Sequence, residues 1–198
     1  MEKLFRFSKI ASIVVLLIAI FRIISSGIVL MFEPIFEYYR TIEIVNDILF
    51  ILFNTLILIF FLLIYKNSTN GSVLRIPTLI GMISSAVAMI RRLFWTFTYY
   101  GGFLDILNMI GVIGLCISFI WIAKYMKNPV KIFSWLCAII PVIAFLFSQF
   151  FFTVLLPYAS DLLEKYLITY HYSVIIINLF KYLLLSVFYY TFSKTLTK

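Results

Sequence analysis

The sequence predicts an all-α integral membrane protein with six transmembrane helices. Of its 198 residues, 64% are hydrophobic and only 12% are charged, whereas a soluble domain is about 45–50% apolar and about 25% charged. Six long apolar stretches alternate with short polar or turn segments. The alternating segments of about ten residues that are typical of an outer-membrane barrel are absent, so we expect the spans to be helices.

The six stretches are 21 to 25 residues long, and a bilayer-spanning helix needs about 20. They leave no room for a soluble catalytic domain, so we expect one six-helix domain over 1–198. The expected spans are 10–32, 44–65, 74–98, 103–125, 132–156 and 172–192.

The stretch 10–32 follows Lys3, Arg6 and Lys9, an order that resembles the basic and apolar regions of a secretory signal peptide. Arg22 interrupts the apolar run where a cleavage region would begin, and apolar sequence resumes beyond it. We therefore expect a retained first helix.

The stretches 44–65 and 74–98 are joined by a short segment in which Asn67 and Asn70 match the glycosylation acceptor pattern. We interpret both as turn residues. Within 74–98, small residues lead to Arg92 at spacings of four, three and four, namely Gly81, Ser85 and Ala88. Such a stripe permits close helix contact, so we expect Arg92 to face protein and Arg91 to lie nearer the edge.

The stretch 103–125 carries a similar set of small residues, Gly111, Gly114 and Ser118, which predicts close packing. Pro141 interrupts the stretch 132–156, where a proline is expected to kink a helix. The stretch 172–192 carries Lys181 and begins beside His171, the only histidine.

The basic residues outside the stretches predict the orientation. Ten fall on one side and only two, Arg40 and Lys165, on the other. The larger set is Lys3, Arg6, Lys9, Lys66, Arg75, Lys124, Lys127, Lys131, Lys194 and Lys198. Because cytoplasmic loops carry the excess of Lys and Arg, both termini are expected to be cytoplasmic.

Charged groups inside the stretches give the strongest indication of a site, since each costs about 2.5–3.5 kcal/mol to insert. Arg22 lies roughly 18 Å from the inner boundary and Lys181 roughly 13 Å from the outer one, at about 1.5 Å per residue. With further polar groups included, five of the six stretches supply such groups toward the outer half. The candidate ligand-binding residues are Arg22, Arg92, Lys181, Asp47, Asp105, Asn108 and Asn178.

Two interpretations of these residues stay open. In the first, they form an outward-facing cationic pocket for an anionic solute, in which Arg binds a carboxylate or phosphate through two hydrogen bonds. In the second, Arg92 pairs with Asp105 or Asp47, while Arg22 and Lys181 meet helix carbonyls or loop acids.

No catalytic or metal-binding pattern is present in the sequence. Cys116 and Cys137 lie in separate apolar runs without a neighbouring His, and no nucleophile–base spacing surrounds His171. We therefore expect no enzymatic activity, no metal and no cofactor. Most of the basic residues behind the formal charge of +8 are explained by the orientation of the chain in the membrane, so no nucleic-acid partner is expected.

These observations predict a non-enzymatic multi-pass protein of the plasma membrane, namely the cell membrane or the inner membrane of a bacterium. We expect it to be the membrane subunit of a larger transport, signalling or defence system. The alternative is a small-molecule carrier or substrate-binding subunit with the cationic pocket described above. Besides the lipid bilayer, expected partners are a cytoplasmic protein at Lys124, Lys127 and Lys131 and a second copy of the chain.

Overall fold

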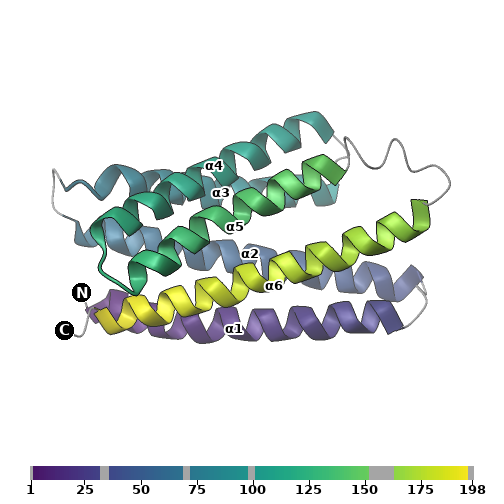
Figure 1. The fold of residues 1–198 in the computed structure, drawn as a ribbon, viewed down its shortest axis with the longest axis horizontal. Coiled ribbons are helices and arrows are strands. Elements are labelled where there is room, and N and C mark those ends of the chain that lie inside the picture. Colours follow the sequence, from purple (N-terminus) through teal and green to yellow (C-terminus); the bar gives the residue numbers. More distant parts are fainter. Residues whose placement is uncertain (1, 32–35, 69–71, 98–100, 152–162, 196–198) are drawn as a thin grey trace.

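The computed structural model describes the backbone of residues 2–31, 36–68, 72–97, 101–151 and 163–195. It describes the side chains of residues 2–25, 44–68, 72–94, 106–151 and 172–195. The described residues form six helices and no strand (Figure 1). These are α1 (Glu2–Met31), α2 (Phe36–Asn67), α3 (Arg75–Phe97), α4 (Gly101–Tyr125), α5 (Val130–Phe150) and α6 (Leu163–Thr195).

All six helices contain a segment long and apolar enough to cross a membrane. The predicted all-α fold with six such helices is confirmed, and it fits a membrane-embedded, multi-pass protein. Three helices extend well beyond the expected spans: α1 has 30 residues, α2 has 32 and α6 has 33. A 32-residue helix is about 48 Å long, and the hydrocarbon core is about 30 Å thick. An apolar pattern identifies only the part of a helix expected in the hydrocarbon core, and the helix itself can continue into the polar interface.

Helix α5 covers most of its expected span and contains a proline. Helix α5 ends at Phe150, and residues 152–156 of the expected span lie outside the described residues. Pro141 lies within α5, which continues on both sides of it. The missing N–H of a proline leaves a carbonyl of the preceding turn without its helical partner.

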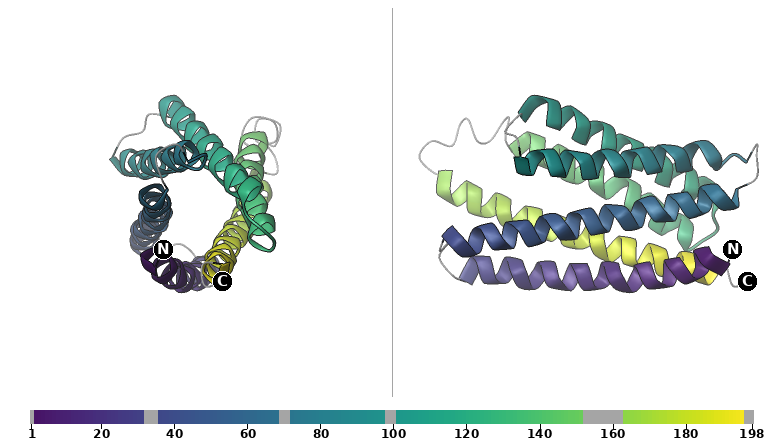
Figure 2. Two further views of the ribbon diagram at one scale, coloured as in Figure 1. Left: turned by 90° about the vertical axis from the view of Figure 1, so that its left-hand side faces the viewer. Right: turned by 180° about the vertical axis from the view of Figure 1, so that it is seen from behind.

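The helices form a closed ring. Each helix packs against its neighbours in the sequence, and α6 packs against α1 through the most extensive contact of all. Figure 2 shows this order in the view along the bundle. The α1–α6 contact closes the ring between residues 174 positions apart, where Ser186 Oγ donates to the Ser12 carbonyl oxygen at 2.8 Å.

Aromatic side chains fill the ring on the side of the chain termini. The Phe60 ring centroid lies 5.5 Å from that of Phe188 and 5.1 Å from those of Tyr189 and Phe192. Phe119 of α4 adds an edge-to-face contact to Phe188 at 5.3 Å. Each such pair contributes about 0.5–1.5 kcal/mol beyond area burial. Because lipid gives helices no hydrophobic drive to associate, this packing holds the bundle together.

Small residues allow α3 to approach its neighbours closely. A Cβ added to Gly81 would lie 2.6 Å from the Phe61 ring of α2. On the other side of α3, Ser118 Oγ of α4 donates to the Pro77 carbonyl oxygen at 2.8 Å. The small residues predicted to permit close packing therefore lie at the α2–α3 and α3–α4 contacts.

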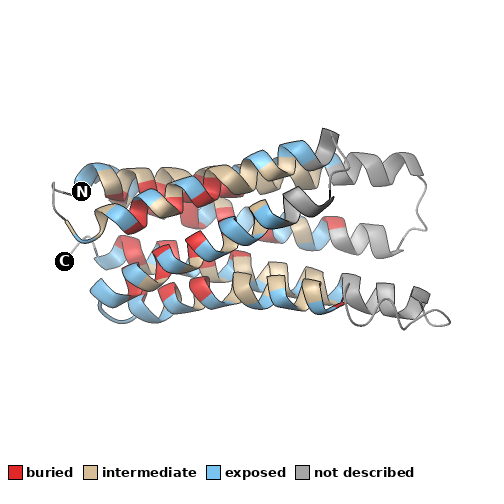
Figure 3. Ribbon diagram, turned by 90° about the horizontal axis from the view of Figure 1, so that it is seen from above, coloured by how far each residue is buried: buried red, intermediate tan, exposed pale blue. Residues whose placement is uncertain are grey.

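Burial is uneven along the bundle. Figure 3 shows buried residues gathered toward the end that carries the termini. In the other half no described side chain is buried over 44–52, 86–94, 106–110, 139–150 or 172–181, and the described side chains that are buried there are Ser25 and Phe151. The fully packed half of α2 begins at Phe53 and that of α6 at Tyr182. At this level α2 and α6 thus change from closely packed to partly accessible.

The first and last described residues, Glu2 and Thr195, lie at the same end of the bundle (Figure 1). The described members of the larger basic set all lie on helix ends or connections at this end. Most are exposed, among them Lys124, Lys127 and Lys131 at the α4–α5 connection. The distribution of charge therefore follows the two ends of the bundle.

Candidate functional site

Four of the candidate residues meet at the border between the packed and the partly accessible half. They are Arg22 of α1, Asp47 of α2, Arg92 of α3 and Lys181 of α6, which we call the cationic cluster. Its centre is formed by the rings of Phe50, Phe53 and Tyr182, which each lie beneath at least one of the cations.

Arg92 pairs with Asp47. Its Nε donates to Asp47 Oδ1, and its guanidinium group forms an ion pair with the same carboxylate. The exposed fractions of the two side chains are 26% and 13%. The guanidinium carbon also lies 5.9 Å from the Phe50 ring centroid. Of the two acidic partners that the sequence left open, the structure shows Asp47, and the side chain of the other, Asp105, lies outside the described residues.

Arg22 is held by a main-chain oxygen. Its Nη2 donates to the Asn46 carbonyl oxygen at 2.9 Å, and its guanidinium carbon lies 5.6 Å from the Tyr182 ring centroid. Its Nε is buried without a hydrogen-bond partner in the described part of the chain, and so is Asn46 Oδ1. A buried polar group that lacks a partner costs about 1–3 kcal/mol. The Arg22 Nε is therefore a donor available to a further acceptor.

The ammonium group of Lys181 lies over aromatic rings. Its Nζ lies 5.0 Å from the Phe53 ring centroid and 5.9 Å from that of Phe50. Among the described residues it has neither a hydrogen bond nor an ion pair. The positive charge of Arg22 lies close enough to act on it. Because like charges repel in a site of low dielectric, this arrangement favours a negative group between the two.

The aromatic rings hold these cations in place. The Phe53 and Tyr182 centroids are 4.6 Å apart with an interplanar angle of 89°. Cation–π contacts contribute about 0.5–1 kcal/mol each at exposed sites and about 2 or more when desolvated. They position the charges without neutralising them. The cluster therefore keeps three cations and one anion, an excess of two positive charges over the described side chains.

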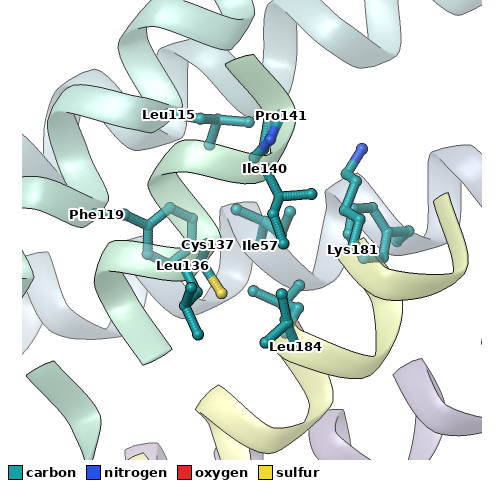
Figure 4. A pocket seen from close by; sticks show the side chains of 11 residues that line it. Ile57, Leu115, Phe119, Leu136, Cys137, Ile140, Pro141, Lys181 and Leu184 are labelled. Carbon is teal, nitrogen blue, oxygen red and sulfur yellow. The ribbon is translucent and has the colours of Figure 1, made fainter. Parts of the chain in front are cut away.

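A small cavity lies beside Lys181, between α2, α4, α5 and α6. Its volume is about 20 Å³, which is enough for one water molecule or a group of similar size. The lining is almost entirely apolar and includes Phe53, Ile57, Leu136, Pro141 and Leu184. In Figure 4 the Lys181 side chain leaves α6 at the edge of this cavity, and its nitrogen points away from Leu184.

Two further candidate residues take no part in the contacts described above. Asn108 of α4 and Asn178 of α6 are half-buried and form no hydrogen bond with any described residue. The Asp105 side chain lies outside the described residues. Arg91 is half-buried like Arg92.

Sequence reasoning missed the three aromatic residues and the Asn46 carbonyl oxygen. Aromatic residues make up 19% of the chain, so nothing in the sequence distinguishes Phe50 and Phe53 from the others. Phe50 lies three residues after Asp47 and therefore near its face of a helix, whereas Phe53, six residues after Asp47, lies about 120° from that face. The spacing could have indicated Phe50 alone.

The described residues contain no group of three or more His, Cys, Asp or Glu that could hold a metal ion. Comparison of the chain with protein-family models, curated proteins and solved structures finds no match. The cationic cluster and its cavity are therefore the structural features on which a function can be argued.

Proposed function

We propose that the protein is a non-enzymatic membrane subunit that binds a small anionic solute at the cationic cluster, as a carrier or the substrate-binding subunit of a larger transport system. The observation that carries the proposal is Lys181, which has no ionic partner among the described residues. The Phe53 ring beneath it contacts the Tyr182 ring beneath Arg22, so the two cations share one aromatic group. No described side chain is buried over 44–52 or 172–181, which supports an approach for a solute from that side.

The energetics support a ligand more than a purely structural role. An intramembrane cation costs about 2.5–3.5 kcal/mol to insert, and Asp47 offsets this cost for Arg92 through the ion pair. Arg22 is offset in part by the Asn46 carbonyl oxygen. For Lys181 the described side chains offer only ring faces, which contribute less than a charged partner. An anion bound between Arg22 and Lys181 would supply the negative charge that Lys181 lacks as a partner.

We further propose the plasma membrane as the location, with the chain termini in the cytoplasm. The concentration of exposed basic residues at the end that carries the termini supports this orientation. The cationic cluster would then open toward the outside. The exposed Lys124, Lys127 and Lys131 provide a cytoplasmic surface for a partner subunit of the system or for a second copy.

The proposal can be tested with the full-length protein in a neutral detergent. Sodium chloride is replaced by sodium phosphate or sodium propionate at constant ionic strength, and the unfolding temperature is measured. A ligand that binds only the folded state adds about 2.7 kcal/mol at a hundredfold excess over Kd. We expect at least one salt to raise the unfolding temperature of the wild type.

The increase is expected to disappear in Lys181→Met and to persist in Lys127→Met, which removes the same charge at an exposed site. If no salt stabilises the wild type, or if both variants respond like the wild type, the cluster does not bind anions.

A further inference from the structure

The unpartnered donors of the cluster restrict the head group of the solute. Arg22 already uses Nη2 on the Asn46 carbonyl oxygen, which leaves its Nε as a buried donor without a partner among the described residues. Lys181 Nζ is the second available donor. Arg92 is engaged by Asp47 and has its charge neutralised. A carboxylate between the two residues can accept from the Arg22 Nε–H with one oxygen and from the Lys181 ammonium with the other.

The surroundings disfavour a larger oxyanion. Phe50, Phe53 and Tyr182 lie beneath the cations and present their ring faces to them. A phosphate would bring more charge and more oxygens against these apolar faces, and charged groups are expensive to bury there. A planar carboxylate can present its oxygens to the two donors and its apolar side to the rings.

The cavity determines which group the carboxylate can carry. Lys181 belongs both to the cationic cluster and to the lining of the cavity, so its aliphatic stem leads from the charged group to the apolar space (Figure 4). Ile57, Pro141 and Leu184 form apolar walls of that space. Its volume of about 20 Å³ is enough for one water-sized group, and therefore for the end of a short alkyl chain.

We infer that the solute is a short-chain monocarboxylate, bound through its carboxylate between Arg22 and Lys181 and through its alkyl end in the cavity beside Leu184. This inference rests on the proposed function and narrows it to one chemical class. Propionate and butyrate carry an alkyl end beside the carboxylate, whereas acetate carries a single methyl group.

The test is equilibrium dialysis of the detergent-purified, full-length protein against radiolabelled acetate, propionate, butyrate and inorganic phosphate. Each methylene that enters the cavity should strengthen binding about fourfold. We expect butyrate and propionate to bind more tightly than acetate, and phosphate to bind least. Binding of all three carboxylates should be lost in Lys181→Met.

Filling the cavity tests binding of the alkyl end separately from binding of the carboxylate. Leu184→Phe should weaken butyrate binding to the level of acetate and leave acetate binding within about twofold of the wild type. Leu183→Phe is the matched control, because Leu183 is exposed and does not line the cavity. If Leu184→Phe does not fold, Leu136→Phe fills the same cavity from α5.

The outcomes distinguish the inference from the function on which it rests. If phosphate binds more tightly than the carboxylates, or if chain length and cavity filling have no effect, the site takes anions but the monocarboxylate inference is wrong. If none of the four anions binds the wild type, both the inference and the proposed function fail.

Discussion

The ion pair between Asp47 and Arg92 joins α2 to α3 at the edge of the packed half, and its removal should weaken the bundle measurably. The perturbation is Asp47→Asn, which keeps the shape of the side chain and removes its charge. Exposed ion pairs contribute about 0.2–1 kcal/mol, whereas breaking a fully buried pair costs about 3–5 kcal/mol.

The observed burial determines where this pair lies in that range. Its side chains are 13% and 26% exposed, so solvent screens it in part. We therefore expect Asp47→Asn to lower the free energy of unfolding by about 2 kcal/mol. Loss of the carboxylate also removes the one anion of the cationic cluster, which acts in the same direction.

The assay is unfolding by titration with sodium dodecyl sulfate from mixed micelles, followed by far-UV circular dichroism. A double-mutant cycle with Arg92→Gln separates the pair from other effects. Arg92→Gln in the Asp47→Asn background should cost much less than in the wild type, since the pair is already broken. If the two single effects add within about 0.3–0.5 kcal/mol, the residues are not coupled and the ion pair does not stabilise the fold.

Three further predictions test other parts of the structure. Gly81→Ala should destabilise the protein by about 1–3 kcal/mol because its Cβ would overlap the Phe61 ring. Gly111→Ala should be tolerated, because its Cβ would lie 3.5 Å from the Ser84 carbonyl oxygen. Equal effects of the two substitutions in the same unfolding titration would contradict the close α2–α3 contact. Ser186→Ala should lower stability by about 0.6–1.7 kcal/mol through loss of the interhelical bond to Ser12, and Thr191→Ala, which removes only bonds within α6, should have a smaller effect. Tags at both termini and in the 67–72 segment should all be protected from impermeant labels applied to intact cells, and external labelling of any of them would overturn the proposed orientation.

The positions of the charged site residues could be predicted from the sequence because an intramembrane charge is costly wherever the helix turns out to lie. Arg22 and Lys181 stood out on that ground alone. Which acid would pair with Arg92 could not be predicted, because α3 packs against both α2, which carries Asp47, and α4, which carries Asp105. In the structure Arg92 pairs with Asp47.

The rest of the site depends on packing that no local pattern encodes. Phe50, Phe53 and Tyr182 are three among many aromatic residues, and their role depends on the closure of α1 on α6. The cavity beside Lys181 is formed by side chains from four helices, and its size is set by how those helices fit together. The apolar pattern gave the hydrocarbon-spanning segments but not the full helices, because it ends where the polar interface begins.

The most direct test of the ligand site is a measurement of proximity between the bound carboxylate and the Lys181 nitrogen. Rotational-echo double-resonance NMR can detect it in reconstituted protein that carries ¹⁵N at the lysine Nζ atoms and is loaded with [1-¹³C]propionate. The ¹³C signal should be dephased by a nearby lysine nitrogen in the wild type and in Lys127→Met, and the dephasing should vanish in Lys181→Met. Absence of dephasing in the wild type, or its persistence in Lys181→Met, would contradict the placement of the anion at the cationic cluster.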